Sequence, residues 1–142
     1  MIITSEHIRG LLKQTWSNLY FIWPTNPKWE DVSDYWMLEI TANCSVRHMI
    51  SIPGIWECEN YGHQFKARVE KYQYDLYQSE IYKPKWRWAI GEIIGIQSDI
   101  FGNPVVHEMN VILTEHGLVL YEPQEDVIKK SDYTFVPFFV KF

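Results

Sequence analysis

The sequence predicts a single α+β domain that spans residues 1–142, and three observations lead to this prediction. Apolar residues recur at helical spacing in the first half of the chain, and stretches rich in β-branched and aromatic residues replace them beyond Pro84. A chain of 142 residues, 46% of them hydrophobic, can bury one packed core. The sequence shows no repeat, low-complexity segment or interdomain linker. We therefore expect helices packed on an antiparallel β-sheet.

Charge and cysteine content argue against several functional classes. The net charge is -5 and no basic run is present, so a nucleic-acid partner is not expected. Charged residues interrupt the apolar N-terminal stretch MIITSEHIRGLLKQ, and no run approaches the length of a membrane span, so neither a signal peptide nor a membrane contact is expected. Two cysteines do not make a disulfide framework, which favours free thiols and a cytoplasmic location.

The first third of the chain predicts one helix followed by less regular segments. After the capping residues Thr4 and Ser5, apolar residues at helical spacing predict a helix of about four turns. These residues are Ile8, Leu11, Leu12, Trp16 and Leu19. The stretch WPTNPKWEDVSD contains two prolines and is expected to be a connection. The next stretch, YWMLEITANCSVRHMISIPG, is apolar but aperiodic, so helix and strand both stay open for it.

A long second helix is predicted after Pro53 and Gly54. Apolar residues recur there every three or four positions, with charged residues between them. The apolar positions are Cys58, Tyr61, Phe65, Val69, Tyr72 and Leu76. Cys58 is expected in the first turn of this helix, on its buried face.

Four stretches beyond Pro84 predict strands. WRWAIGEIIGIQS is rich in Trp and Ile, PVVHEMNVILT alternates, LVLYE follows it after EHG, and YTFVPFFVKF closes the sequence. Alternation places His107 on the same face as Met109, and Asn110 on the opposite face. A two-residue turn at 115–116 places Glu122 opposite Met109, diagonal to His107, whereas a turn at 116–117 makes the contact between His107 and Glu122 long. The register therefore decides whether these two residues meet.

The chain order Cys58, His107, Glu122 is that of papain-like cysteine hydrolases. A helix N-terminus favours the thiolate, which is the attacking species. An imidazole takes the thiol proton, and a carboxylate fixes the tautomer of that ring. The order predicts a peptidase or amidase with a peptide or protein substrate. No cofactor is required for this chemistry.

The segments CENYG, WAIGEIIG and HEMNVILTEHGLVLYEPQ carry a family resemblance. They resemble a phage and bacterial group of small papain-like proteins related to the C-terminal cysteine-protease domain of the Marasmius mushroom agglutinin. That group has a Cys-Asp-Asp-Phe-Ala motif on a helix, a His-Ala-x-Asn strand and a Glu-Pro-Gln after the hairpin. Over residues 54–126 the resemblance implies a papain-like fold, with Cys58 as nucleophile, His107 as base and Glu122 as orienting acid.

Departures from the group's motifs affect the expected chemistry. Glu59 and Asn60 replace the two Asp residues, which serve a divalent cation in some relatives, so the resemblance leaves such a cation open. Tyr61, Gly62 and Glu108 replace Phe, Ala and Ala. The residues expected to support the triad are Asn110, Gln124, Glu59 and Asn60.

Two features argue against catalysis. Glu57 and Glu59 flank the cysteine, and negative neighbours disfavour a thiolate. Ile52 stands where papain-like enzymes place the glutamine of the oxyanion hole, so a second donor is not identified. The alternative is a catalytically inactive papain-like scaffold that acts as a binding, inhibitor or adaptor protein.

Other interpretations of the same residues remain open. Cys44, His48, Cys58 and His63 could supply a tetrahedral zinc site, although their spacing matches no familiar finger. Cys44 with His48 is a further candidate nucleophile. Aromatic side chains could line a groove for sugar or peptide instead of filling a core. The tryptophans concerned are Trp23, Trp29, Trp36, Trp56, Trp86 and Trp88.

Overall fold

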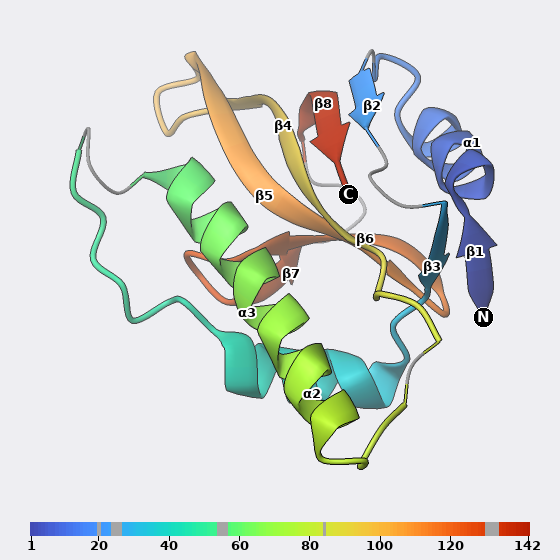
Figure 1. Cartoon of the computed structure of the whole chain (residues 1–142). Helices are drawn as coiled ribbons and strands as arrows, with labels where there is room; N and C mark the ends of the chain where they lie inside the picture. Colours follow the sequence, from blue (N-terminus) through green and yellow to red (C-terminus); the bar gives the residue numbers. More distant parts are fainter. Residues whose placement is uncertain (20, 24–26, 54–56, 84, 130–133) are drawn as a thin grey trace.

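A computed structural model describes residues 1–19, 21–23, 27–53, 57–83, 85–129 and 134–142 (Figure 1). The helices are α1 (Ser5–Thr15), α2 (Asp34–Cys44) and α3 (Cys58–Gln78). The strands are β1 (Ile2–Thr4), β2 (Phe21–Trp23), β3 (Lys28–Glu30), β4 (Ile90–Ser98), β5 (Pro104–Thr114), β6 (Gly117–Glu122), β7 (Val127–Lys129) and β8 (Val136–Lys141). Among the described residues, no helix combines the length and the apolar character needed to cross a membrane.

The strands form one large sheet and one small sheet. The large sheet has six strands in the order β2-β8-β4-β5-β6-β7, and the small one pairs β1 with β3. Neighbouring strands run antiparallel except for β2, which runs parallel to β8. The α+β prediction is confirmed, whereas the expectation of a purely antiparallel sheet is wrong at this one edge.

Helices cover both faces of the large sheet. On one face, Ile8 and Leu12 of α1 share a buried cluster with Met109 and Val111 of β5. On the other face, apolar residues of α2 and α3 share a second cluster with Ile112 of β5. Neighbouring residues of β5 thus serve opposite clusters, as the alternation of a strand requires.

The long helix and the two central strands match their predictions closely. Helix α3 begins at Cys58 and buries Tyr61, Phe65 and Val69 at helical spacing. Strand β5 covers the alternating stretch from Pro104 to Thr114. The first helix is shorter than expected, because α1 ends at Thr15.

The first part of the undecided stretch forms α2, which ends at Cys44. Ser33 caps this helix by accepting a hydrogen bond from the N–H of Trp36 at 3.4 Å. Met37, Ile40 and Cys44 are buried, but the apolar Leu38 remains 72% exposed. Apolar residues on both sides of the helix hide its period, so the sequence alone did not decide between helix and strand.

The stretch expected to be a connection contains a strand. Trp29 of β3 is buried and lies opposite Ile3 of β1. Residues 24–26 of this stretch lie outside the described residues. A three-residue strand shows no period of its own, and its pairing partner comes from the chain's first residues, so local sequence does not indicate it.

Candidate functional site

The hairpin between β5 and β6 has the first of the two predicted registers. Thr114 pairs with Gly117, which leaves Glu115 and His116 as the two-residue turn. Asn110 pairs with Tyr121, so the next position of β6, Glu122, comes level with Met109. This register brings the side chains of His107 and Glu122 into contact.

Cys58, His107 and Glu122 lie together at the N-terminal end of α3. The carboxylate of Glu122 binds Nε2 of the His107 ring. The thiol of Cys58 lies close enough to the same ring to raise the pKa of His107. His107 is 8% exposed and Glu122 is 3% exposed, whereas Cys58 is half-buried. A partly accessible thiol therefore lies against a buried histidine–carboxylate pair.

The buried pair sets the charge of the histidine. Burial by itself lowers the pKa of His107, but its contacts with Cys58 and Glu122 and the negative charge of Glu122 outweigh burial and raise that pKa to about 9. The ring is consequently protonated at neutral pH. The other carboxylate oxygen of Glu122, Oε1, accepts a hydrogen bond from the backbone N–H of Gln124 at 3.1 Å.

The surroundings of Cys58 are acidic. The thiol donates to Oε2 of the neighbouring Glu59 at 3.6 Å. Asn60 helps to cap the N-terminus of α3, because its Oδ1 accepts a hydrogen bond from the backbone N–H of Glu57 at 2.9 Å. Ile52 is 47% exposed and offers an alkyl side chain where a polar donor was sought.

Asn110 contacts the backbone and not His107. Its Nδ2 donates to the carbonyl oxygens of Gly62 at 2.9 Å and Gly91 at 3.2 Å. This agrees with the strand alternation, which turns Asn110 away from His107. Asn110 therefore joins β5 to α3 and β4.

Glu108 is a buried acid whose role the sequence analysis missed. It is 8% exposed, lies next to His107, and faces α3. Burial, followed by the charges of Glu92 and Glu59, raises the pKa of Glu108 to about 8, although His107 opposes the shift. The sequence signal was an acid at a position where the resembling group has alanine.

The zinc quartet does not assemble. Cys44 lies in the core between α2 and α3, and burial raises the pKa of its thiol to about 11. In the part of the chain that the structure describes, the ligand atoms of Cys44, His48, Cys58 and His63 do not converge. Cys44 is also too buried to act as the alternative nucleophile.

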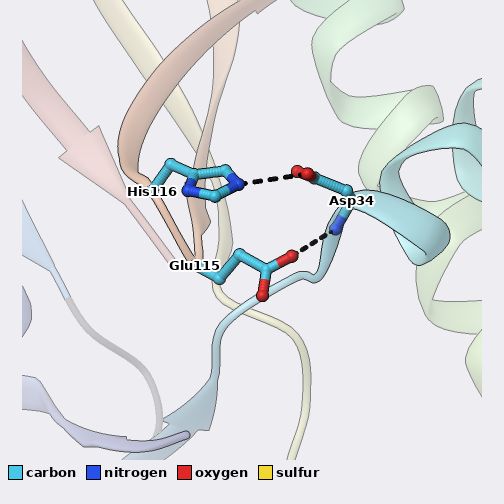
Figure 2. Close-up of side chains that lie close together, drawn as sticks. All are labelled: Asp34, Glu115 and His116. Atoms are coloured by element: carbon cyan, nitrogen blue, oxygen red, sulfur yellow. Dashed lines mark hydrogen bonds and ion pairs between the residues drawn. The ribbon is translucent and has the colours of Figure 1, made fainter.

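A different polar group gathers at the hairpin turn. Figure 2 shows Glu115 and His116 pointing toward Asp34 at the start of α2. Glu115 accepts the backbone N–H of Asp34 at 2.8 Å, and Nε2 of His116 lies 3.1 Å from Oδ2 of Asp34. The three side chains are exposed and lie close enough together to hold a cation. Their mutual contacts join the hairpin to the helix without one.

Comparison with known proteins shows which fold the chain shares. Neither a protein-family model nor a curated protein sequence matches the chain. A solved structure described as a PSL1a-E64 complex is similar with a TM-score of 0.76 and 16% identity, covering 99% of this chain and 50% of that one. A second, Polyporus squamosus lectin bound to the human-type influenza-binding epitope Neu5Acα2-6Galβ1-4GlcNAc, is similar with a TM-score of 0.76 and 15% identity, covering 99% and 49%.

These likenesses correct the predicted function. The chain has the fold of part of a fungal lectin, and it spans about half the length of those chains. The prediction of a cysteine hydrolase, whether a peptidase or an amidase, is contradicted by this likeness to lectins, which fits the alternative of a binding protein better. The roles of Cys58, His107 and Glu122 are not decided by a shared fold.

Proposed function

We propose that the protein is a ligand-binding protein on a papain-like scaffold, and that Cys58, His107 and Glu122 contact the ligand. The observation that supports this proposal is the half-buried thiol over the buried pair of His107 and Glu122. Buried charged groups are costly unless they are paired, so a buried histidine–carboxylate pair beside an accessible side chain marks a candidate functional site.

The chemistry of the site suits a ligand that carries a hydrogen-bond acceptor. His107 is protonated at neutral pH, because its pKa is raised to about 9 by the contacts that outweigh its burial. The protonated ring is paired with the Glu122 carboxylate on one side and lies near the Cys58 thiol on the other. A carbonyl oxygen of the ligand near Cys58 would be placed to accept a hydrogen bond from the protonated ring or from the thiol.

The descriptions of the two similar structures each name a bound small molecule. One names E64 and the other names a sialylated trisaccharide, whose sialic acid carries a carboxylate. The second description favours carbohydrate over the peptide partner expected from the sequence. Both compounds are suitable probes for the present chain.

Calorimetric titration with each compound tests the proposal. We expect saturable binding of at least one compound, lost in Cys58→Ala and in His107→Gln and retained in His116→Gln, which removes an exposed ring at the hairpin turn. Intact mass after each titration separates a reversible complex from an adduct on the thiol.

Two results would contradict the proposal. One is that neither compound binds the wild-type protein. The other is binding that stays unchanged in both Cys58→Ala and His107→Gln. Steady release of product from peptide substrates by the wild-type protein would instead restore the hydrolase that the lectin likeness argues against.

A further inference from the structure

A second hollow lies along the C-terminal half of α3, away from Cys58. Its volume is about 420 Å³, and its walls come from α3, from the segment leading into β4 and from the start of β3. The residues used below are Lys28, Tyr74, Tyr77, Lys85, Trp86 and Arg87. Glu70 on this wall is twelve residues beyond Cys58, which corresponds to about 18 Å along a helix.

This hollow continues into a neighbouring one of about 340 Å³. Both are lined by Glu70 and Arg87, and the second adds Lys66 and Lys141 among its walls. The two hollows adjoin at Glu70 and Arg87 and are together called the α3 groove below. The groove runs from Tyr77 near the end of α3 to Lys141 at the end of β8.

Aromatic rings form one part of the α3 groove. Tyr74 is 58% exposed and Tyr77 is 51% exposed, although both are large side chains on a helix with an apolar face to bury. Trp86 is half-buried beside them, and the amide of buried Gln73 fixes its backbone by donating to its carbonyl oxygen at 3.2 Å. The predicted aromatic groove therefore involves Trp86. Among the other candidate tryptophans, Trp29 and Trp88 are core and Trp36 packs against the core, whereas Trp56 and the side chain of Trp23 lie outside what the structure describes.

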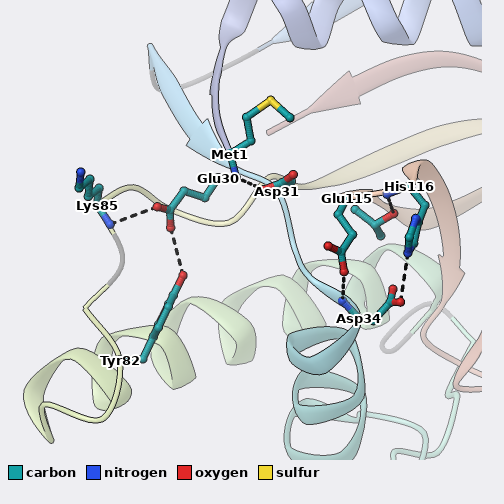
Figure 3. A network of polar contacts seen from close by, with 9 residues as sticks. Met1, Glu30, Asp31, Asp34, Tyr82, Lys85, Glu115 and His116 are labelled. Carbon is teal, nitrogen blue, oxygen red and sulfur yellow. Dashed lines mark hydrogen bonds and ion pairs between the residues drawn. The ribbon is translucent and has the colours of Figure 1, made fainter.

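The segment that carries Trp86 is held in place from the other side. Figure 3 shows Glu30 between Tyr82 and Lys85. Its carboxylate accepts the Tyr82 hydroxyl at 3.2 Å and the backbone N–H of Lys85 at 3.4 Å. The aromatic part of the α3 groove is thus positioned before any ligand arrives, which lowers the entropy cost of binding.

Positive charge gathers in the α3 groove although the whole chain has a net charge of -5. Its cations are Lys28, Lys66, Lys85, Arg87 and Lys141, and its acids are Glu70 and Glu92. Glu92 is also bound by His63, at 2.8 Å, and Arg87 lies 3.4 Å from Glu70. Burial lowers the pKa of Lys66, and the charges of Lys141 and Arg87 lower it further, against the opposite effect of Glu92 and Glu70. A negative ligand would relieve this crowding of cations.

We propose that the α3 groove binds an acidic oligosaccharide that carries carboxylates. Arginine binds a carboxylate through parallel hydrogen bonds. The exposed rings of Tyr74 and Tyr77 can stack on the apolar faces of sugar rings, beside the half-buried Trp86, over whose ring the Lys28 ammonium lies 5.1 Å from the centroid. Nucleic acid is the competing ligand for such a surface, but the acids Glu70 and Glu92 interrupt the cations of the groove, which disfavours a phosphate backbone. The site is separate from the one under the proposed function, so either can fail alone.

Titration with tetragalacturonate tests the proposal, with its fully methyl-esterified form as the neutral control. We expect saturable binding of the acid, weaker binding of the ester, and chemical-shift changes confined to the α3 groove. Arg87→Gln should weaken binding by about tenfold, because a charge-assisted hydrogen bond is lost. Tyr77→Ala should weaken it by about fivefold, because a stacking surface is lost.

Matched variants separate the groove from general surface effects. Lys83→Gln removes an exposed cation paired with Glu80, and Tyr35→Ala removes an exposed ring on α2; both should bind as the wild type does. Cys58→Ala should also bind normally, which distinguishes this site from the first. Equal binding of acid and ester, equal losses in Arg87→Gln and Lys83→Gln, or tighter binding of a single-stranded oligonucleotide would each overturn the proposal.

Discussion

Asn110 of β5 binds the backbone of Gly62 in α3, with its Nδ2 2.9 Å from the glycine carbonyl oxygen. The asparagine is fully buried, and the same nitrogen also donates to the carbonyl of Gly91 in β4. One amide thus joins the long helix to two central strands. Its Oδ1 is buried without a hydrogen-bond partner among the described residues.

Asn110→Ala should destabilise the protein. The substitution leaves two buried carbonyl oxygens without this donor, and we expect a loss of about 1–3 kcal/mol in the free energy of unfolding. Urea unfolding monitored by circular dichroism measures the loss. Asn43→Ala, at an exposed position of α2, is the matched control and should change stability by less than about 0.5 kcal/mol. Similar values for the two variants would contradict the role given to Asn110.

Glu108 should make the protein less stable as the pH rises. Burial and the charges of Glu92 and Glu59 raise its pKa from 4.5 to about 8, so the folded state holds a proton that the unfolded state releases between these values. Stability should therefore fall from pH 4.5 to about 8 and then level off.

Glu108→Gln removes this dependence. We expect the variant to be more stable than the wild type at pH 9 by an amount on the order of 2 kcal/mol, and to differ little near pH 4. Urea unfolding across this pH range is the measurement, with Glu125→Gln as an exposed control. A variant less stable than the wild type at pH 9 would show that the ionised carboxylate is stabilised.

The pair of His107 and Glu122 should be visible in a histidine titration. Burial lowers the pKa of His107, but the contacts with Cys58 and Glu122 raise it from 6.5 to about 9. The stability that this pair contributes is complete below pH 6.5 and is lost as the pH rises through about 9. In Glu122→Gln, we expect the pKa of His107 to fall toward its ordinary value, measured by NMR of the ring. An unchanged titration in the variant would rule out Glu122 as the source of the shift.

Gly95 should resist substitution where β4 meets β8. The strand register shifts between Ile94 and Gly95, which lies opposite Pro137. A Cβ at Gly95 would lie 2.6 Å from the backbone oxygen of Val136 and 2.6 Å from the ring of Phe135. We expect Gly95→Ala to cost about 1–3 kcal/mol, because the backbone must move.

Gly10→Ala is the matched control for this prediction. The site lies in α1, and a Cβ there meets no atom within 4 Å. Alanine favours a helix over glycine, so the control should gain up to about 1 kcal/mol. The same sign of change in both variants, measured by thermal unfolding, would contradict the packing argument.

The elements that could be predicted from the sequence are those long enough to show a regular spacing of apolar residues. β5 and α3 carry eleven and twenty-one residues, enough for alternation and helical spacing to show. Strands β3 and β7 have three residues each and depend on partners distant in sequence. Their existence follows from tertiary pairing and not from local pattern.

The contact of His107 with Glu122 could be predicted because it depends only on the register of one hairpin. Cys58 could be placed because it opens a strongly periodic helix. The function could not be predicted from these residues, since the same three side chains suit a nucleophile or a ligand contact. The α3 groove was hidden because its cations come from separate segments: β3, α3, the approach to β4, and β8.

The contact between Glu115 and Asp34 has a consequence for the order in which the chain assembles. Glu115 lies eighty-one residues after Asp34 in the sequence, and its carboxylate accepts the backbone N–H of Asp34 at the start of α2. During synthesis, α2 leaves the ribosome long before the hairpin turn exists, with only Ser33 to cap it. Short isolated helices are marginal in water, so α2 should remain frayed in nascent chains until β5 and β6 have paired. We therefore expect the hairpin, whose contacts are local, to form before α2 gains this second contact at its N-terminus.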